Sequence, residues 1–529
     1  MLFLKKIYLC IFVTSICYLL NCSAISNPTS PDLNSNENFL YYKVKIAAFN
    51  ADSITFTLKS NGYNEFILPY LFFDNPVHKL SSPVIKELFI IDDNGHSVNY
   101  RSRTEKIGPI NNTVISLTGD YQQPVTIIHK INPAAILPDE TINLKPIDIS
   151  DSHLFFLGNA VFIVPFSTTS LVSLWRDPHS ISVDIKSKTG SSLYGVPTSG
   201  SFRCHNIYEL IFCQISSGKE PFLQGYGGGT PFSFINFSDS TMPSDLTPIK
   251  NGFSDILDAI WKRYGAFNDN QFTVGISPIG GGLEGTFSFI QIGPSASSFY
   301  YVLAHEALHQ FVGIRCGEYD DPWWKEGATT YLSYLIAVRL DLYSKDEFRK
   351  SMITRFVNAD SARFKIALSD QWLRANMFPS GVFGIVYDKG SQVMMLMDYA
   401  VRTASANRYS IEDISAYLVK KFDGSAFHRN DFLDAFRRFG NADVKEIFRM
   451  YIDSTASPSD SLLKFTFERL DSLGAFGSKV FLQSKLLAES RSSSMPSGYN
   501  VNLFSVTNKS RYLHRAFLSP RFKSRLNQT

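Results

Sequence analysis

The sequence predicts an α+β protein of several domains, with a β-sandwich-like part in its N-terminal half and a mainly helical part after it. The first observation is a change of pattern near residue 250, where short β-branched and aromatic runs give way to segments with helical periodicity. The second is length, because 529 residues fit two to four domains at about 150 residues each. The third is composition: 44% hydrophobic and 19% charged residues are not those of a disordered chain.

A leader is expected over residues 1–24. Two lysines precede an apolar run over residues 7–20, which is shorter than the roughly 20 residues that span a bilayer, and small residues follow it. This pattern is typical of a signal peptide and predicts an exported protein that is periplasmic, at the cell surface or extracellular. Cleavage after Ala24 is one alternative. The other is lipidation of Cys22, whose preceding residues resemble a bacterial lipoprotein box, with residues 25–38 as a flexible tether.

Residues 39–245 are expected to form a β-rich N-terminal region. Its β-branched and aromatic runs, separated by Asn, Gly, Asp and Pro, include residues 41–48, 53–58, 84–91 and 125–131. Two packed sheets are the natural way to bury strands this short, which predicts a β-sandwich-like domain. Cys204 and Cys213 flank a mostly apolar segment there, where a disulfide and two buried thiols are both consistent with the sequence.

The second domain is placed at residues 246–456. A helix over 252–264 and a strand over 272–276 open it. Further helices are expected over residues 298–314, 322–342, 387–403, 411–422, 431–439 and 443–451. Residues 457–529 remain as a C-terminal region with a basic tail.

The net charge of +3 hides three unlike parts. Residues 490–529 carry seven basic and no acidic residues, and the leader carries two lysines, so the body over 25–489 has a net charge of −6. An acidic body argues against an extended basic groove, and no nucleic-acid partner is expected.

The motif that carries chemistry is His305-Glu306-Ala307-Leu308-His309, inside a predicted helix. Two imidazoles four residues apart project from one helical face, close enough to bind one cation, and Glu306 points toward the adjacent water position. A pair of ordinary surface histidines on a helix is the alternative, so the decision depends on a third ligand.

Glu326 is the preferred third ligand, because an ordered helix can orient its side chain toward the metal ion. Asp321 can cap that helix and Pro322 can occupy its first turn. Glu318, Asp320 and Asp321 are rivals, but they lie in an expected turn. We therefore expect one Zn²⁺ ion bound by three residues and one water. The ligands are His305, His309 and Glu326.

Over roughly residues 270–455 the sequence resembles the gluzincin peptidases. It is most similar to the PDZ-containing glycyl aminopeptidase family and more distantly to the aminopeptidase N family. Residues 281–284 (GGLE) resemble the Gly-Leu-Glu-His segment that precedes the zinc helix, and the segment around Glu326 resembles Trp-x-x-Glu-Gly-x-Thr-x-Tyr. Residues 386–390 (VYDKG) match the Tyr-x-Lys-Gly block.

This resemblance implies a thermolysin-like catalytic domain and a zinc aminopeptidase that removes small N-terminal residues, Gly or Ala, from peptide substrates. It implies that Glu306 is the general base and that Tyr387 donates a hydrogen bond to the oxyanion. It further implies that Glu284 binds the substrate's α-ammonium beside Gly282.

Some residues depart from the family pattern and bear on substrate preference. Gly285 stands where His is expected, and Phe311 replaces a common Trp. A secreted zinc endopeptidase and a catalytically inactive surface binding protein are therefore kept as alternatives. Residues 457–529 are short for a PDZ module, and we interpret this region as a remnant of one.

Overall fold

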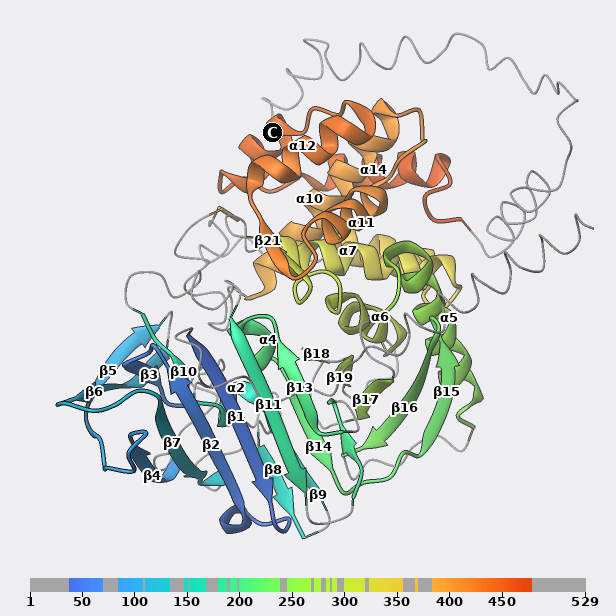
Figure 1. Ribbon diagram of the computed structural model, residues 1–529. Helices are drawn as coiled ribbons and strands as arrows, with labels where there is room; N and C mark the ends of the chain where they lie inside the picture. The colour runs from blue at the N-terminus through green and yellow to red at the C-terminus, as the bar shows by residue number, and fades with distance from the viewer. Residues whose placement is uncertain are drawn as a thin grey trace, which may run out of the picture.

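The protein is described from a computed structural model (Figure 1). The described part runs from residue 38 to 477 with gaps at 70–83, 108–109, 134–146, 152, 168–178, 188–190, 197–198, 238–244, 268–270, 277–281, 286–287, 293–298, 319–322, 355–366 and 370–382. The expected leader, Cys22, most of the tether and the basic tail lie outside the described residues.

The N-terminal part is built from antiparallel and mixed β-sheets (Figure 1). One sheet has the order β13-β11-β1-β2-β7-β4: Ser201–Cys204, Ser180–Ser187, Phe39–Ile46, Ile54–Asn61, Val125–Ile131 and Ile85–Ile91. A second has the order β10-β3-β6-β5: Val164–Pro165, Glu65–Ile67, Ile110–Thr118 and Asn99–Ile107. A third has the order β12-β14-β9-β8: Leu193–Tyr194, Gln214–Ser217, His153–Leu157 and Ile147–Ser150.

Alternation of side chains explains why these segments are strands. Along β2 and β7 every second residue is buried, which is the period of a strand with one face in a core. The short elements η1 (Ala51–Ser53), α2 (Gly158–Val161) and α4 (Ile207–Ile211) complete this part. The buried side chains of the sheets form one hydrophobic cluster, so the predicted β-rich region is confirmed.

His129 lies inside this cluster. Its ring stacks on Phe56 with 5.2 Å between centroids, and its Nε2–H donates to the Val161 carbonyl oxygen at 2.8 Å. Nδ1 is buried with no hydrogen-bond partner among the described residues. Burial lowers the pKa of His129 to about 4, against the backbone hydrogen bond, which acts to raise it.

We expect the free energy of unfolding to fall as the pH drops from about 6.5 to about 4, by about 3 kcal/mol from His129 alone. The unfolded chain binds a proton on this residue below about pH 6.5, whereas the folded protein binds it only near pH 4. Denaturant unfolding of wild type and His129→Gln across this range measures the effect. An equally steep pH dependence in both proteins would refute it.

The second part combines a sheet with a set of helices (Figure 1). The sheet order is β15-β16-β17-β19-β18: Leu223–Gly227, Thr230–Asn236, Phe272–Ile276, Phe289–Ile292 and Gly282–Gly285. The helices are α5 (Thr247–Tyr264), α6 (Phe299–His309), α7 (Trp323–Arg339), α8 (Lys345–Thr354), α10 (Phe383–Ala404), α11 (Ile411–Lys421), α12 (Arg429–Gly440), α13 (Lys445–Ile447), η4 (Phe448–Ile452) and α14 (Asp460–Ser472). Strands β20 (Cys316–Glu318) and β21 (Ser425–Phe427) pair beside them.

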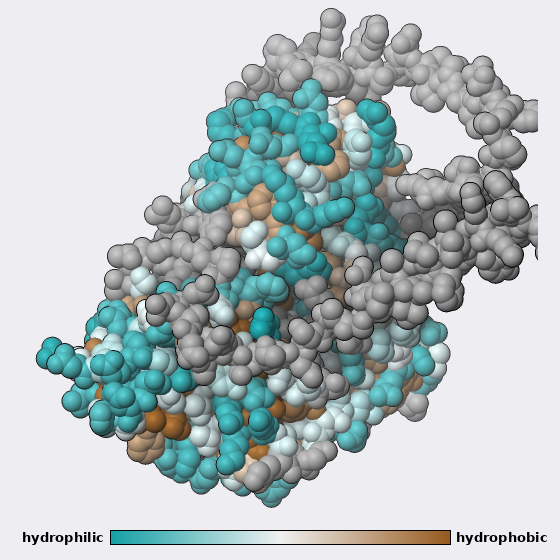
Figure 2. All heavy atoms as spheres, in the orientation of Figure 1, coloured by the Kyte–Doolittle hydropathy of each residue, from teal (hydrophilic) through white to brown (hydrophobic). Residues whose placement is uncertain are grey.

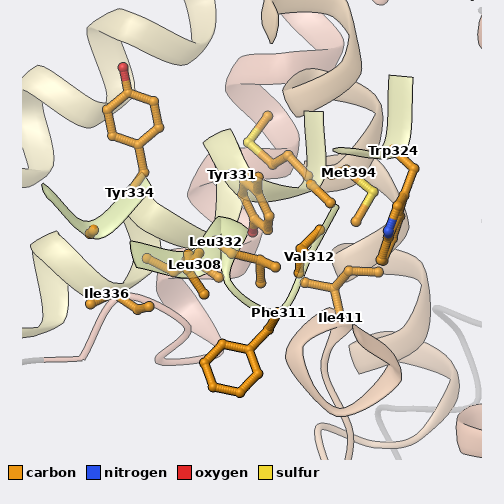
Figure 3. Packing of buried hydrophobic residues seen from close by; sticks show 14 of the residues in the cluster. Leu308, Phe311, Val312, Trp324, Tyr331, Leu332, Tyr334, Ile336, Met394 and Ile411 are labelled. Carbon is orange, nitrogen blue, oxygen red and sulfur yellow. The ribbon is translucent and has the colours of Figure 1, made fainter. Parts of the chain in front are cut away.

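Helices α6 and α7 lie between the sheets and the group of helices α10, α11, α12 and α14 (Figure 1). Their inner faces bury Leu308 and Leu332, and Met394 of α10 lies in the same cluster (Figure 3). Such burial is worth about 1.5–3 kcal/mol for each large apolar side chain. The helices that carry the candidate metal ligands are therefore surrounded by the largest core of the described chain.

The domain limits differ from the expected ones at both ends. β15 and β16 belong to the sheet of the second part, because β16 pairs in parallel with β17. This part therefore begins near residue 223 and not at 246. At the other end α14 packs its buried face into the same core, which continues to Phe476 and past the expected limit at 456. Pairing and packing with distant segments, which local patterns do not report, set both limits.

Cys204 and Cys213 are buried free thiols, which is the second of the two alternatives for this pair.

Hydrophilic residues cover most of the helical part in the face shown in Figure 2. Within the described residues, no helix has the length and apolar character needed to cross a membrane.

Candidate active site

His305 and His309 lie on the last turns of α6, and both are buried. Their four-residue spacing puts the two rings on one face, with 4.6 Å between ring centroids. The two Nε2 atoms face each other at 3.0 Å. The helix ends at His309, and the chain turns there through residues that lead to β20.

Glu326 comes from the first turn of α7 and completes the group. Its Oε2 lies 3.4 Å from His305 Nε2 and 3.3 Å from His309 Nε2. Glu326 is almost entirely buried, and Oε2 has no hydrogen-bond partner among the described residues. The rivals Asp320 and Asp321 lie outside the described residues.

The three donor atoms fit a tetrahedral metal ion. Zinc–nitrogen bonds of about 2.0–2.1 Å place two ligands of a tetrahedral ion about 3.3 Å apart, and the three observed separations are 3.0, 3.3 and 3.4 Å. Two imidazoles and one carboxylate are also a usual ligand set of catalytic zinc. An unpartnered buried carboxylate oxygen between two imidazole nitrogens therefore suits a cation.

The backbone holds His309 in the tautomer that a metal requires. Its Nδ1–H donates to the Val312 carbonyl oxygen at 3.0 Å, so the lone pair of the neutral ring is on Nε2. The Oγ1 atom of Thr329 lies 3.5 Å from the same Nδ1. Sequence patterns did not single out either residue, because the contacts depend on how α6 ends and packs on α7.

Glu306 lies beside the ligand group and is almost entirely buried. Gly282 allows this approach, since a Cβ built on it would lie 2.2 Å from Glu306 Oε1. Burial raises the pKa of Glu306 well above the usual carboxyl range, and the nearby Glu284 and Glu326 act in the same direction. A divalent cation beside it favours the ionised form, which is the form that accepts a proton.

Tyr387 faces the same centre from α10. Its ring stacks on His305 with 5.8 Å between centroids and 22° between planes. Burial raises its pKa well above 10, with further contributions from Glu326, Glu284 and Glu306. The phenol therefore keeps its proton at neutral pH and can act as a hydrogen-bond donor.

A contact between two glycines brings α10 close enough to α7 for Tyr387 to reach this centre. A Cβ built on Gly327 would lie 2.7 Å from backbone atoms of Gly390, and one built on Gly390 would lie 2.9 Å from the Gly327 Cα. Gly327 follows the candidate ligand Glu326, and Gly390 lies one turn after Tyr387. Any side chain at this crossing forces the helices apart.

Gly390→Ala is expected to lower activity on the order of tenfold to hundredfold, because it shifts Tyr387 away from the reaction centre. It should also destabilise the fold by about 1–3 kcal/mol through overpacking. Steady-state kinetics of Gly390→Ala, Tyr387→Phe and the double variant separate the two effects. If the shift of Tyr387 is the cause, the glycine change costs much less when the hydroxyl is already absent; independent costs would refute it.

Glu284 lies on β18, and its carboxylate is near those of the other acidic residues of the site. Ligand atoms of Glu284, Glu306 and His309 lie within 4.8 Å of one another. Gln214 of β14 donates to the Glu284 carbonyl oxygen at 2.8 Å, and Gln310 donates to the Gly285 carbonyl oxygen at 2.5 Å. No sequence pattern predicted these two glutamines, which hold β18 from β14 and from the residue that follows α6.

Residues 293–451, which include α6, α7 and most of α10–η4, match the Peptidase family M1 domain. This match supports a gluzincin metallopeptidase. The predicted enzyme class is confirmed, and the M1 family implies zinc. No curated protein matches the chain.

Solved structures have a fold similar to that of this chain. An aminopeptidase N family protein of Idiomarina loihiensis has a TM-score of 0.58 at 14% identity, over 81% of this chain and 78% of that one. Yeast LTA4 hydrolase in complex with bestatin has a TM-score of 0.52 at 15% identity, over 83% and 72%. At these identities the similarity establishes the fold, and the predicted order of a β-rich part before a helical catalytic part is confirmed.

Proposed function

We propose that the protein is a zinc-dependent aminopeptidase in which His305, His309 and Glu326 bind one zinc ion. The observation that carries this proposal is the convergence of two Nε2 atoms and one Oε2 atom within 3.4 Å of one another, with the Glu306 carboxylate beside them. The aminopeptidase N family protein and the LTA4 hydrolase named above have a similar fold, which supports the proposal.

Each residue has a role that follows from its position. When bound, zinc polarises the scissile carbonyl and lowers the pKa of water to about 7. Glu306, which is outside the ligand group, accepts the proton of the attacking water and passes it to the leaving amine. Tyr387 donates a hydrogen bond to the carbonyl oxygen as that atom gains negative charge.

Glu284 is the residue that would make the enzyme an exopeptidase. Its buried carboxylate lies beside Glu306, where it can bind the α-ammonium of a peptide whose first carbonyl is at the reaction centre. We propose small N-terminal residues, Gly or Ala, as substrates, with Gly282 beside them. An endopeptidase is the nearer alternative, and an inactive binding protein is the other.

The test is the release of Gly or Ala from chromogenic amides by the purified chain, together with its metal content. Activity should disappear with a chelator and return with zinc. Mass spectrometry of a digested peptide then separates stepwise trimming from internal cleavage. Activity that survives removal of the metal would overturn the proposal, and bound zinc without turnover would favour the binding protein.

We propose in addition that the enzyme is exported, and that Cys22 attaches it to a membrane as a lipidated residue. Support comes from the leader pattern of residues 1–24. The mass of the mature N-terminus in expressing cells decides between an acylated Cys22 and cleavage after Ala24.

A further inference from the structure

The carboxylate proposed to bind the substrate's ammonium already has a partner from the same chain. Lys325 on α7 donates from Nζ to Glu284 Oε1 on β18. The two side chains are only 12% and 9% exposed, so water does not compete effectively for either charge. The resemblance to the glycyl aminopeptidases did not single out Lys325, which precedes the candidate ligand Glu326.

Lys325 is held in this place from several sides. Its Nζ also donates to the Tyr208 hydroxyl oxygen at 3.2 Å and lies 4.7 Å from the centre of the Phe212 ring. Its stem passes over Gly313, where a Cβ would lie 2.7 Å from Lys325 Cγ. The ammonium thus lies between Tyr208 on α4, Phe212 just after that helix, and Glu284 on β18.

Glu284 is equally constrained. Gln214 donates to its carbonyl oxygen, and Gln310 donates to the next carbonyl along the strand. These bonds fix the backbone of the strand, and the Glu284 side chain is only 9% exposed, so its carboxylate has little room to move away from Lys325. A substrate α-ammonium that binds Glu284 must share it with Lys325 or displace Nζ, and two like charges at one carboxylate repel each other.

We propose that Lys325 is a specificity-determining residue that competes with the substrate's α-ammonium for Glu284. It thereby weakens selection for peptides with a free N-terminus over peptides whose N-terminus is acylated. This inference deepens the proposed aminopeptidase function and rests on it. The other carboxylate oxygen beside Nζ is Glu326 Oε1, at 3.6 Å, and a displaced Nζ can pair with it.

The test compares binding of Ala-Ala-Ala and its N-acetylated form by calorimetry. The zinc-loaded proteins carry Glu306→Gln, with or without Lys325→Met, so that the peptides are not hydrolysed. Removing Lys325 should lower the Kd of the free-amine peptide about tenfold or more. The buried Glu284 carboxylate then lacks its lysine partner, and the α-ammonium of the peptide can pair with it without competition. The Kd of the acetylated peptide should stay within about twofold of its starting value.

Two further variants test whether the effect depends on the contacts of Lys325 with Tyr208 and Glu284. Tyr208→Phe leaves α7 intact and removes one acceptor of Nζ, so a smaller change of the same sign is expected. In a Glu284→Gln background Lys325→Met should have no selective effect. Zinc content is measured for each protein, because Lys325 is next to Glu326.

Several outcomes would overturn the inference. They are equal changes in both Kd values, no change in either, or a selective effect that persists without the Glu284 carboxylate. An active, zinc-loaded wild type with such results refutes only the role of Lys325. A wild type without zinc or turnover refutes the proposed function, while the ammonium-binding comparison still reports on Lys325.

Discussion

Replacing Glu306 with Gln is expected to lower kcat by about 10²–10⁴, the range typical of a lost general acid–base group, while zinc content stays unchanged. Glutamine has nearly the shape of glutamate but cannot accept the proton of the attacking water at neutral pH. It should fit in the same space, because Gly282 presents no side chain to this position. Glu306 supplies none of the three donor atoms of the proposed metal site, so its replacement should leave that group intact.

The measurement is kcat and KM for a Gly or Ala amide beside metal analysis of both proteins. Glu468→Gln on α14 is a matched control, because its carboxylate is 58% exposed and far from the ligand group in sequence. The control should keep wild-type activity. Activity of Glu306→Gln within a few-fold of wild type would exclude Glu306 as the general base.

Replacing Tyr387 with Phe is expected to lower kcat by about 10²–10³ with little change in KM, as is typical when one donor to a developing oxyanion is lost. The ring that stacks on His305 is kept, so packing and metal binding should be preserved. Only the hydroxyl is removed, and burial keeps that group protonated because it raises its pKa.

Kinetics and thermal unfolding of Tyr387→Phe test this expectation. Tyr301→Phe is the matched control, since that ring is also near His305, at 5.9 Å between centroids, but on the zinc helix itself. It should change kcat by less than about threefold. Equal losses in the two variants would show that removing any tyrosine hydroxyl near His305 lowers activity, and would exclude a specific role of the Tyr387 hydroxyl.

Local patterns were sufficient for much of the fold. The strands over 125–131 and 272–276 were predicted with the limits that β7 and β17 have, because a buried strand shows its alternation or its apolar run directly. The helix that carries His305 and His309 was expected over 298–314 and is α6 at Phe299–His309. Helices α8 and α14 were not predicted.

The amino-acid sequence by itself determined the chemistry that is available: two histidines one turn apart, a glutamate between them and a third candidate ligand at the start of the next helix. These are short-range relations, which helical geometry converts directly into space. For the same reason three candidate ligands for one zinc ion could be named from the sequence.

Only the tertiary structure decided how that chemistry is surrounded. Lys325 meets Glu284 across 41 positions, Gln214 holds the Glu284 carbonyl across 70, and the close contact of Gly327 with Gly390 brings Tyr387 to the site. No local period reports such pairs, because they arise where α7 and β14 meet β18 and where α7 crosses α10. The specificity proposed for Lys325 therefore follows from the fold, whereas the proposed metal ligands follow from the motif.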